Sequence, residues 1–378
     1  MDFLTGASDY IIPFLVLLTV VVFVHELGHF WVARRCGVRV DVFSVGFGPE
    51  LFGFTDRRGT RWKFSAIPLG GYVKMFGQGE QVLESDGRER EMTAAERTVA
   101  FHHKPVWQRA AIVFAGPAAN YVLTIVALML LFVLVGQPMV PTVVGEVLKD
   151  SAAEAAGIQA GDRIVSINGQ PTEGFDDLVA LVQGSGGQPI DLLVRRDASE
   201  IHITVQPRPV VPEGGDASAP QTYRLGVAPA AQLDYERHGL ASALWGAVVQ
   251  TYTLSVQIIV NLWEMIAGER SSQELGGVLR IGKIAGDVAK SSYVDFLFLI
   301  PMLSLNLGLL NLFPIPLLDG GHLAFYAVEG IRGRPLGERA QEWGLRIGVA
   351  LVLGLVVFAT WNDLVVLKVV DFIKDLVT

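Results

Sequence analysis

Cysteine is nearly absent from this chain: Cys36 is the only one among 378 residues. A single cysteine excludes a disulfide within the chain and any metal site built from several thiolates. Charged residues are also scarce, at 18%, whereas 51% of the residues are hydrophobic and the mean hydropathy is +0.42. This balance excludes an ordinary soluble enzyme and indicates a protein of the lipid bilayer.

Positive charge is in short supply as well, with 30 Lys and Arg against 38 Asp and Glu and a formal net charge of −8. No run of Lys or Arg is interleaved with aromatic residues. Both observations exclude a nucleic-acid partner. No small-residue cleavage site follows the first apolar stretch, so we expect a retained helix there rather than a signal peptide.

Four apolar stretches approach the ~20 residues that a helix needs to cross a bilayer, which predicts a polytopic α-helical membrane protein with four transmembrane helices. They are residues 10–33, 110–135, 296–313 and about 345–361. No basic residue precedes Arg34, whereas the first loop is rich in them, so that loop is expected in the cytoplasm. Both termini and the segment between the second and third spans then lie outside. The next inward loop carries Arg332, Arg334, Arg339 and Arg346.

The end of the first span carries the sequence His-Glu-Leu-Gly-His at residues 25–29. Residues four apart share one face of a helix, so His25 and His29 can present two imidazoles to one Zn²⁺. Glu26 can serve a water molecule at that metal as general base. Ionisable groups at membrane depth are disfavoured by about 2.5 kcal/mol or more each, and a bound metal would explain why His25, Glu26 and His29 occur together here. A histidine pair satisfied by neighbouring helices is the alternative.

A third ligand is expected beyond the third span, where residues 311–322 read Asn-Leu-Phe-Pro-Ile-Pro-Leu-Leu-Asp-Gly-Gly-His. The two prolines end a regular helix and the glycines permit a tight turn, so Asp319 can point sideways toward the first span. The topology places Asp319 and His29 near the same membrane face. Two histidines and one carboxylate with an open fourth position are typical of catalytic zinc.

Between the second and third spans the pattern changes to short β-branched runs broken by Gly, Asn and Asp. We expect strands at 142–147, 163–167, 190–195, 200–206 and 224–227, helices at 152–156 and 175–182, and a flexible insertion at 207–220. This order resembles a PDZ domain of the bacterial periplasmic-protease type, an α+β fold. Such a domain can bind a peptide or chain terminus by strand addition, or act only as a steric plug.

The stretch 241–263 is apolar enough to be mistaken for a fifth span, but it contains several polar residues. If it crossed, Asp319 would end about 30 Å from His29 across the hydrocarbon. We therefore interpret it as a helix at the outer interface, anchored by Trp245 and Trp263. The predicted domains are 1–136 with the histidine motif, 137–230 as the PDZ domain, 231–290 as the interfacial region and 291–378 with the aspartate motif.

Together these motifs resemble the site-2 proteases, and within them the bacterial regulator-of-sigma-E type with a single PDZ domain. The match includes residues 25–29, Gly-Phe-Gly-Pro at 46–49, Phe-Ala-Gly-Pro-Ala-Ala-Asn at 114–120 and the aspartate motif. The resemblance implies His25, His29 and Asp319 as zinc ligands and Glu26 as catalytic base. It also implies that Asn311 and Pro314 hold unwound substrate near the metal.

The same resemblance implies that residues 67–75 form a β-hairpin-like loop that dips into the membrane, with Gly70, Gly71 and Tyr72 handling substrate. Some relatives carry two tandem PDZ domains, whereas this chain has room for one. From the residues alone, Gly116 and Pro117 indicate a helix kink with close packing. Asn120 can hydrogen-bond either to another helix or to substrate.

The predicted function is therefore that of a metalloendopeptidase of the bacterial inner membrane, with its active site near the cytoplasmic side. It would cleave single-span membrane proteins within the membrane, as in regulated cleavage of an anti-sigma factor. A metal-ion transporter and a proteolytically inactive PDZ scaffold are the alternatives. A transporter should show ligands on both sides of the midplane and an internal repeat, and an inactive scaffold should lack Glu26 or a ligand.

Overall fold

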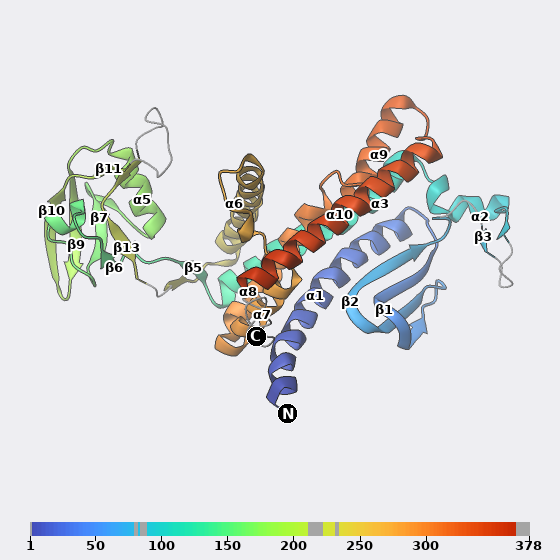
Figure 1. Ribbon diagram of the computed structural model, residues 1–378, viewed down its shortest axis with the longest axis horizontal. Helices are drawn as coiled ribbons and strands as arrows, with labels where there is room; N and C mark the ends of the chain where they lie inside the picture. The colour runs from blue at the N-terminus through green and yellow to red at the C-terminus, as the bar shows by residue number, and fades with distance from the viewer. Residues whose placement is uncertain (1, 79–81, 84–88, 211–221, 231–233, 368–378) are drawn as a thin grey trace, which may run out of the picture. The chain divides into compact units, whose positions relative to one another are not determined.

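The computed structural model describes residues 2–78, 82–83, 89–210, 222–230 and 234–367 (Figure 1). The chain divides into two compact units. The first combines Met1–Leu130 with Leu240–Thr378, and the second is Leu131–Gly239. The finer division into four domains expected from the sequence stays a prediction.

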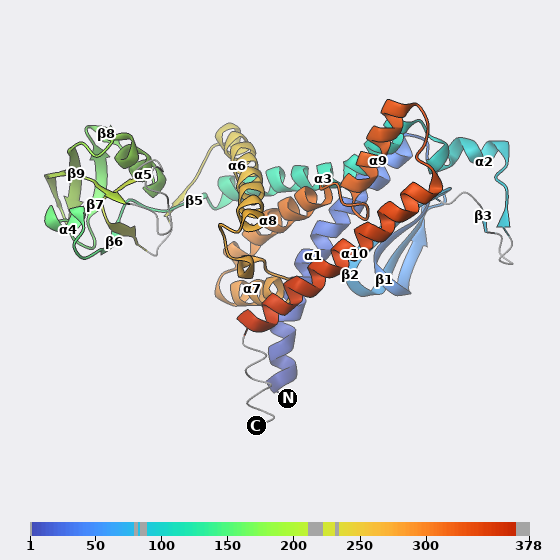
Figure 2. The same cartoon turned by 45° about the horizontal axis from the view of Figure 1, so that its top comes forward.

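Helices build most of the first unit. They are α1 (Asp2–Arg35), α2 (Ala94–Val99), the 3₁₀ turn η1 (Phe101–His103), α3 (Val106–Leu134), α6 (Leu240–Ala267), η2 (Ser272–Glu274), α7 (Val278–Ser291), α8 (Tyr293–Asn311), α9 (Asp319–Arg332) and α10 (Glu338–Val366). Helix α1 packs against α7, α8 and the β1–β2 sheet, and both views show α7 near its N-terminal end (Figures 1 and 2).

Five of these helices are long and apolar enough to cross a membrane. Four of them, α1, α3, α8 and α10, correspond to the predicted spans. The fifth is α6, which the sequence analysis assigned to the outer interface. Length and composition thus allow α6 as a fifth span, because its polar residues are too few to lower its mean hydropathy below that of a span. Its assignment to the outer interface stays a prediction.

Two bent strands, β1 (Val40–Thr55) and β2 (Arg61–Met75), form a sheet that folds back on itself. Val42 lies opposite both Lys74 and Arg61, and Val45 lies opposite both Gly71 and Phe64. The first half of β1 is therefore flanked on both edges by β2. The expected loop at 67–75 is the second half of β2 and belongs to a larger sheet than the sequence motif indicated. A small pair, β3 (Val82–Leu83) with β4 (Glu89–Arg90), follows it.

Aromatic packing fixes one face of this sheet on α1. Phe43 is fully buried, its ring stacks on Trp62 at 4.3 Å, and Phe30 of α1 meets it edge-on at 5.4 Å. The sheet also exposes large apolar side chains, namely Phe47, Leu51, Phe52, Phe54, Ile67 and Leu69. Exposed apolar groups this concentrated favour contact with lipid or with a partner chain.

The second unit is a small α+β fold. Its four-stranded sheet has the order β10-β9-β7-β8, and further pairs are β13 with β6, β14 with β5, and β11 with β12. The elements are β5 (Gln137–Met139), β6 (Val144–Val147), α4 (Ala152–Ala155), β7 (Arg163–Ile167), β8 (Gln170–Pro171), α5 (Phe175–Gly184), β9 (Ile190–Arg196), β10 (Ser199–Val205), β11 (Arg208–Val210), β12 (Thr222–Arg224), β13 (Val227–Pro229) and β14 (Asp234–Glu236). The order expected from the sequence is confirmed, although the expected closing strand is divided between β12 and β13. Of the expected insertion, residues 211–220 lie outside the described ranges.

A buried carboxylate stabilises this unit. The side chain of Asp162 is 1% exposed and receives both Nε and Nη2 of Arg196 at 2.8 Å, together with the N–H of Gln159 at 2.8 Å. The hydrogen bonds from Arg196 hold the pKa of Asp162 below its usual value. The ionised carboxylate therefore favours the folded unit above about pH 4, and this contribution is lost as the pH falls through the lowered pKa.

We expect Arg196→Gln to lower the urea midpoint of this unit at pH 7 and to reduce the further loss between pH 5 and pH 3. Deuterium exchange at β7 and β9 in the full-length protein measures both effects. Arg195→Gln is the matched control, because the Arg195–Glu200 pair is about half exposed on both sides. An unchanged pH dependence in Arg196→Gln would contradict the assignment.

Candidate metal centre

His25 and His29 lie one turn apart on α1, and their rings meet edge-on. Their Nε2 atoms are 3.2 Å apart, and both residues are buried. The Nδ1 of His29 is 2.9 Å from the carbonyl oxygen of Ile112 on α3. That carbonyl can only accept, so Nδ1 carries the proton and Nε2 of His29 keeps its lone pair. One histidine is thus held in the form that binds a metal.

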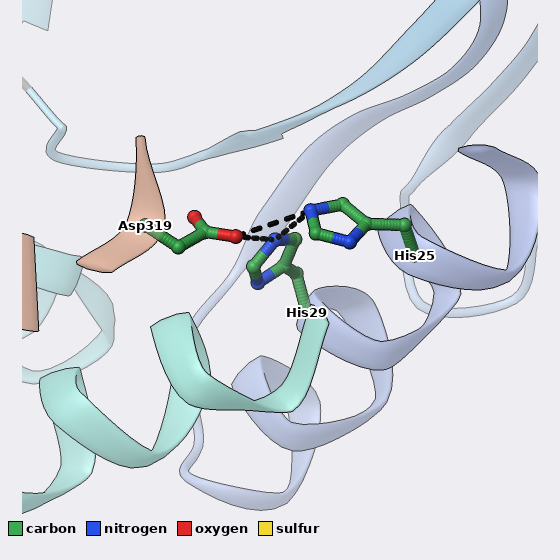
Figure 3. Close-up of side chains that lie close together, drawn as sticks. All are labelled: His25, His29 and Asp319. Carbon is green, nitrogen blue, oxygen red and sulfur yellow. Dashed lines mark hydrogen bonds and ion pairs between the residues drawn. The ribbon is translucent and has the colours of Figure 1, made fainter. Parts of the chain in front are cut away.

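Asp319 is the first residue of α9 and completes the cluster (Figure 3). Its Oδ2 lies 3.1 Å from Nε2 of His25 and 3.5 Å from Nε2 of His29. The turn after α8 aims it there. A Cβ on Gly320 or Gly321 would lie 2.3 Å from the carbonyl oxygens of that turn, so only glycine lets α9 begin so close to the end of α8.

The three side chains fit a divalent metal by donor chemistry as well as by position. Two imidazole nitrogens and one carboxylate oxygen converge, and these are ligand types that zinc takes at catalytic sites. Oδ2 of Asp319 is buried and, within the described ranges, has no hydrogen-bond partner beyond the two imidazoles. A buried oxygen of this kind requires a partner, and a cation supplies one.

Glu26 follows His25 directly and lies against the second half of β2. The backbone of Val73 hydrogen-bonds its carboxylate. A Cβ on Gly71 would be 3.5 Å from Cγ of Glu26 and only 2.6 Å from the carbonyl oxygen of Ser44. Glycine at this position therefore lets β2 approach both α1 and β1. On its other edge this part of β2 has no strand partner among the described residues.

A cavity of about 1540 Å³ opens beside the cluster within the first unit. It is lined by all four predicted catalytic and metal-binding residues and also by Tyr72 and Asn311. Pro314, Gly70 and Gly71 are not among its described lining residues, so the structure does not bring the whole predicted substrate-handling set together. Also in the lining are His102, His103 and His322.

An ion pair that the sequence analysis did not identify lies close by. Nη2 of Arg109 on α3 is 2.6 Å from Oε1 of Glu329 on α9, with both side chains 11% exposed. The guanidinium also lies 4.9 Å from the ring centre of Tyr326. The pair connects α3 to the helix that begins with Asp319. Since its partners are 220 positions apart, no local pattern could have revealed it.

Close approach of α3 to α1 brings the site together. A Cβ on Gly116 would lie 2.3 Å from Nε2 of His29 and 2.9 Å from Cε1 of His25. A Cβ on Gly28 would lie 2.2 Å from the carbonyl oxygen of Ala115. Gly116 therefore leaves the space that the two rings occupy, a stronger constraint than the helix kink inferred from sequence.

We expect Gly116→Ala to lower the zinc bound per chain to less than half, because the added methyl group occupies the space of the imidazoles. Zinc in the purified full-length protein is measured by atomic emission. Gly354→Ala is the control, since nothing lies within 4 Å of its Cβ position in α10. Wild-type zinc content in Gly116→Ala would refute this explanation of the glycine.

Among solved structures, the PDZ domain of the SdrC-like protein from Listeria innocua matches with 18% identity and a TM-score of 0.21. The match covers 24% of this chain and 96% of that domain. A second match, the PDZ domain of the SdrC-like protein from Listeria monocytogenes, has 17% identity and a TM-score of 0.21, and covers 25% and 93%.

Full-length comparisons address the whole chain. The model of peptidase family M50 matches residues 13–355. A protein of Rhizobium meliloti assigned as a zinc metalloprotease is 42% identical over 374 residues, which cover 96% of this chain and 99% of the relative. Metalloprotease MmpA of Caulobacter vibrioides is 37% identical over 397 residues, covering 99% and 100%. The chain therefore belongs to peptidase family M50 and is a zinc metalloprotease.

Proposed function

We propose that this metalloprotease cleaves peptide bonds within transmembrane segments of single-span membrane proteins, such as anti-sigma factors. The observation that supports this most is the location of the His25, His29 and Asp319 cluster, which lies among helices apolar enough to cross a bilayer. A protease that acted on soluble chains would gain nothing from ligands buried at this depth, where ionisable groups are costly.

In the proposed reaction, His25, His29 and Asp319 hold the zinc. When bound, zinc acts as a Lewis acid that polarises the substrate carbonyl and acidifies water. Glu26 accepts the proton of the attacking water and then delivers it to the nitrogen of the leaving amine. The hydrogen bond from the backbone of Val73 orients the carboxylate for both transfers.

Substrate binding is proposed at the second half of β2. A helical substrate must unwind before cleavage, since its carbonyl groups are engaged in helix hydrogen bonds. The edge of β2 that has no strand partner among the described residues can then accept it as an added strand next to the Val73–Glu26 hydrogen bond. Asn311 offers a side-chain amide in the same cavity. Gly70, Gly71 and Pro314 would act indirectly, by shaping the strand and the turn.

We propose that four helices cross the bacterial inner membrane and that α6 lies at the outer interface. Lys290, at the end of α7, pairs with Asp9 of α1 at 3.2 Å, so α8 begins at the end of α1 remote from His29. Asp363, near the end of α10, accepts from the N–H of Gly277 at 2.9 Å, so the start of α7 lies beside this end of α10.

Both ends of α6 are accounted for by this arrangement. The carbonyl of Ser272, shortly after α6, accepts from Asn362 at 2.8 Å, next to the start of α7. Before α6, the N–H of His238 donates to the carbonyl of Phe132 in the last turn of α3. The two ends thus meet the outer ends of α10 and α3. Figure 2 shows α6 crossing α3 at a steep angle, as expected of a helix along the interface.

The second unit is proposed to be an extracytoplasmic PDZ-like domain. Its strand and helix order supports this assignment. It would bind the exposed terminus of a membrane protein already trimmed outside the membrane, or exclude untrimmed ones. In either role the partners of this domain are protein substrates. We propose that both termini of the protease also lie outside the cytoplasm.

Replacing Glu26 by Gln should lower cleavage of a tagged single-span substrate by about 10²–10⁴-fold, because the proton acceptor is lost while the ligands remain. Fragment formation in membranes and zinc content of the purified protein are measured together. Glu274→Gln, an exposed carboxylate of the outer loop, should behave as wild type. Undiminished cleavage by a zinc-loaded Glu26→Gln protein would eliminate the mechanism, and transport of zinc across the membrane by a wild-type protein that cleaves nothing would favour a transporter.

A cysteine at Gln273 should be labelled from outside in intact spheroplasts, in a Cys36→Ser background, because α6 does not carry the chain across. A cysteine at Arg334 should react only after the membrane is opened. Labelling of each cysteine is measured with a maleimide that does not cross the membrane. The reverse pattern would mean that α6 crosses the membrane.

A further inference from the structure

Asn120 of α3 is a fully buried residue beside the metal ligands, and the proposed mechanism does not use it. Its side-chain nitrogen lies 3.3 Å from Nδ1 of His25. Its side-chain oxygen is buried and, among the residues the structure describes, has no hydrogen-bond partner. A buried amide with one end on a ligand and the other unsatisfied calls for an explanation.

The position of Asn120 is fixed through its backbone. Its carbonyl accepts hydrogen bonds from the hydroxyls of Thr124 and Ser304, each at 2.9 Å. A Cβ on Gly308 of α8 would lie 3.1 Å from Cβ of Asn120, so the two helices meet closely here. The amide is therefore held facing His25 but can turn about its own Cβ–Cγ bond.

The two ends of this amide select opposite forms of His25. With nitrogen toward Nδ1, the amide donates, so the imidazole proton is on Nε2, which faces Oδ2 of Asp319 at 3.1 Å. A half-turn brings the oxygen to the same place. The oxygen accepts a proton on Nδ1, and Nε2 then has a lone pair for a metal.

His29 differs, since the carbonyl of Ile112 can only accept. Of the two histidines, only His25 faces a partner with both a donor and an acceptor. Turning the amide exchanges the two ends, so the contact with His25 is made in either orientation. With the oxygen toward Nδ1, the lone pair of Nε2 is left for a metal.

We propose that Asn120 is a positioning residue that orients His25. Either end of its amide holds the imidazole at Nδ1, and with the oxygen there the lone pair of Nε2 is free for a metal. The inference rests on the proposed function, in which His25 binds zinc.

The test is the zinc affinity of the full-length protein in detergent, measured by competition with a chromophoric chelator. Asn120→Leu keeps the bulk but removes the acceptor, and should weaken zinc binding by about 10–100-fold. Asn120→Asp can only accept, and should bind zinc as tightly as wild type or more tightly. Should Asn120→Leu fail to fold, Asn120→Ala serves in its place. It removes the amide without adding a branched side chain and should show the same loss of zinc affinity.

Thr251→Ala is the matched control, because it removes a buried hydrogen bond within α6, to the carbonyl of Ala247, and none made by Asn120 or His25. Its affinity should stay within a few fold of wild type. Equal weakening by the Asp and Leu variants, or no weakening by Leu or Ala, would overturn the inference. His25→Ala separates this from failure of the proposed site: wild-type affinity in that variant would mean that His25 is not a ligand at all.

Discussion

The close packing of α1 on α3 is the contact on which the rest of the site depends. Gly28 and Gly116 remove the side chains that would separate the helices. At that distance the carbonyl of Ile112 reaches His29 and the amide of Asn120 reaches His25. A histidine pair on an isolated helix would have free rotamers, whereas here each ring is fixed from behind by α3. Orientation of the ligands is thus a property of the helix pair.

Burial makes this orientation obligatory. In an apolar region each polar atom without a partner costs free energy comparable to a lost hydrogen bond, or more if it is charged. The broken segment between α8 and α9 is tolerated because its carbonyls pack against protein, and because Asp319 points to the histidines. The Arg109–Glu329 pair then holds α9 to α3, the same helix that orients the imidazoles. One helix therefore positions both halves of the cluster.

Local patterns predicted which three side chains converge, because a helical repeat and a proline-glycine turn are properties of neighbouring residues. His25 and His29 required only the spacing, and Asp319 required only the turn and the topology. The contacts of Ile112, Asn120 and Val73 could not be predicted, since each depends on packing between segments far apart in the sequence. The extent of the β1–β2 sheet was also missed, because its folded register comes from long-range pairing. The ambiguity of α6 has a different origin: hydropathy measures composition, and crossing depends on where the ends lie.

The ligands come from opposite ends of the chain, and this has a consequence for biosynthesis. While the protein is being made, α1 and α3 enter the membrane first with two histidines and no carboxylate partner. The second unit must then be synthesised before α8 and α9 can bring Asp319 to the two histidines. A truncated or half-inserted chain therefore lacks a complete ligand set. Proteolytic competence is therefore acquired last, and an unfinished copy of the chain has none.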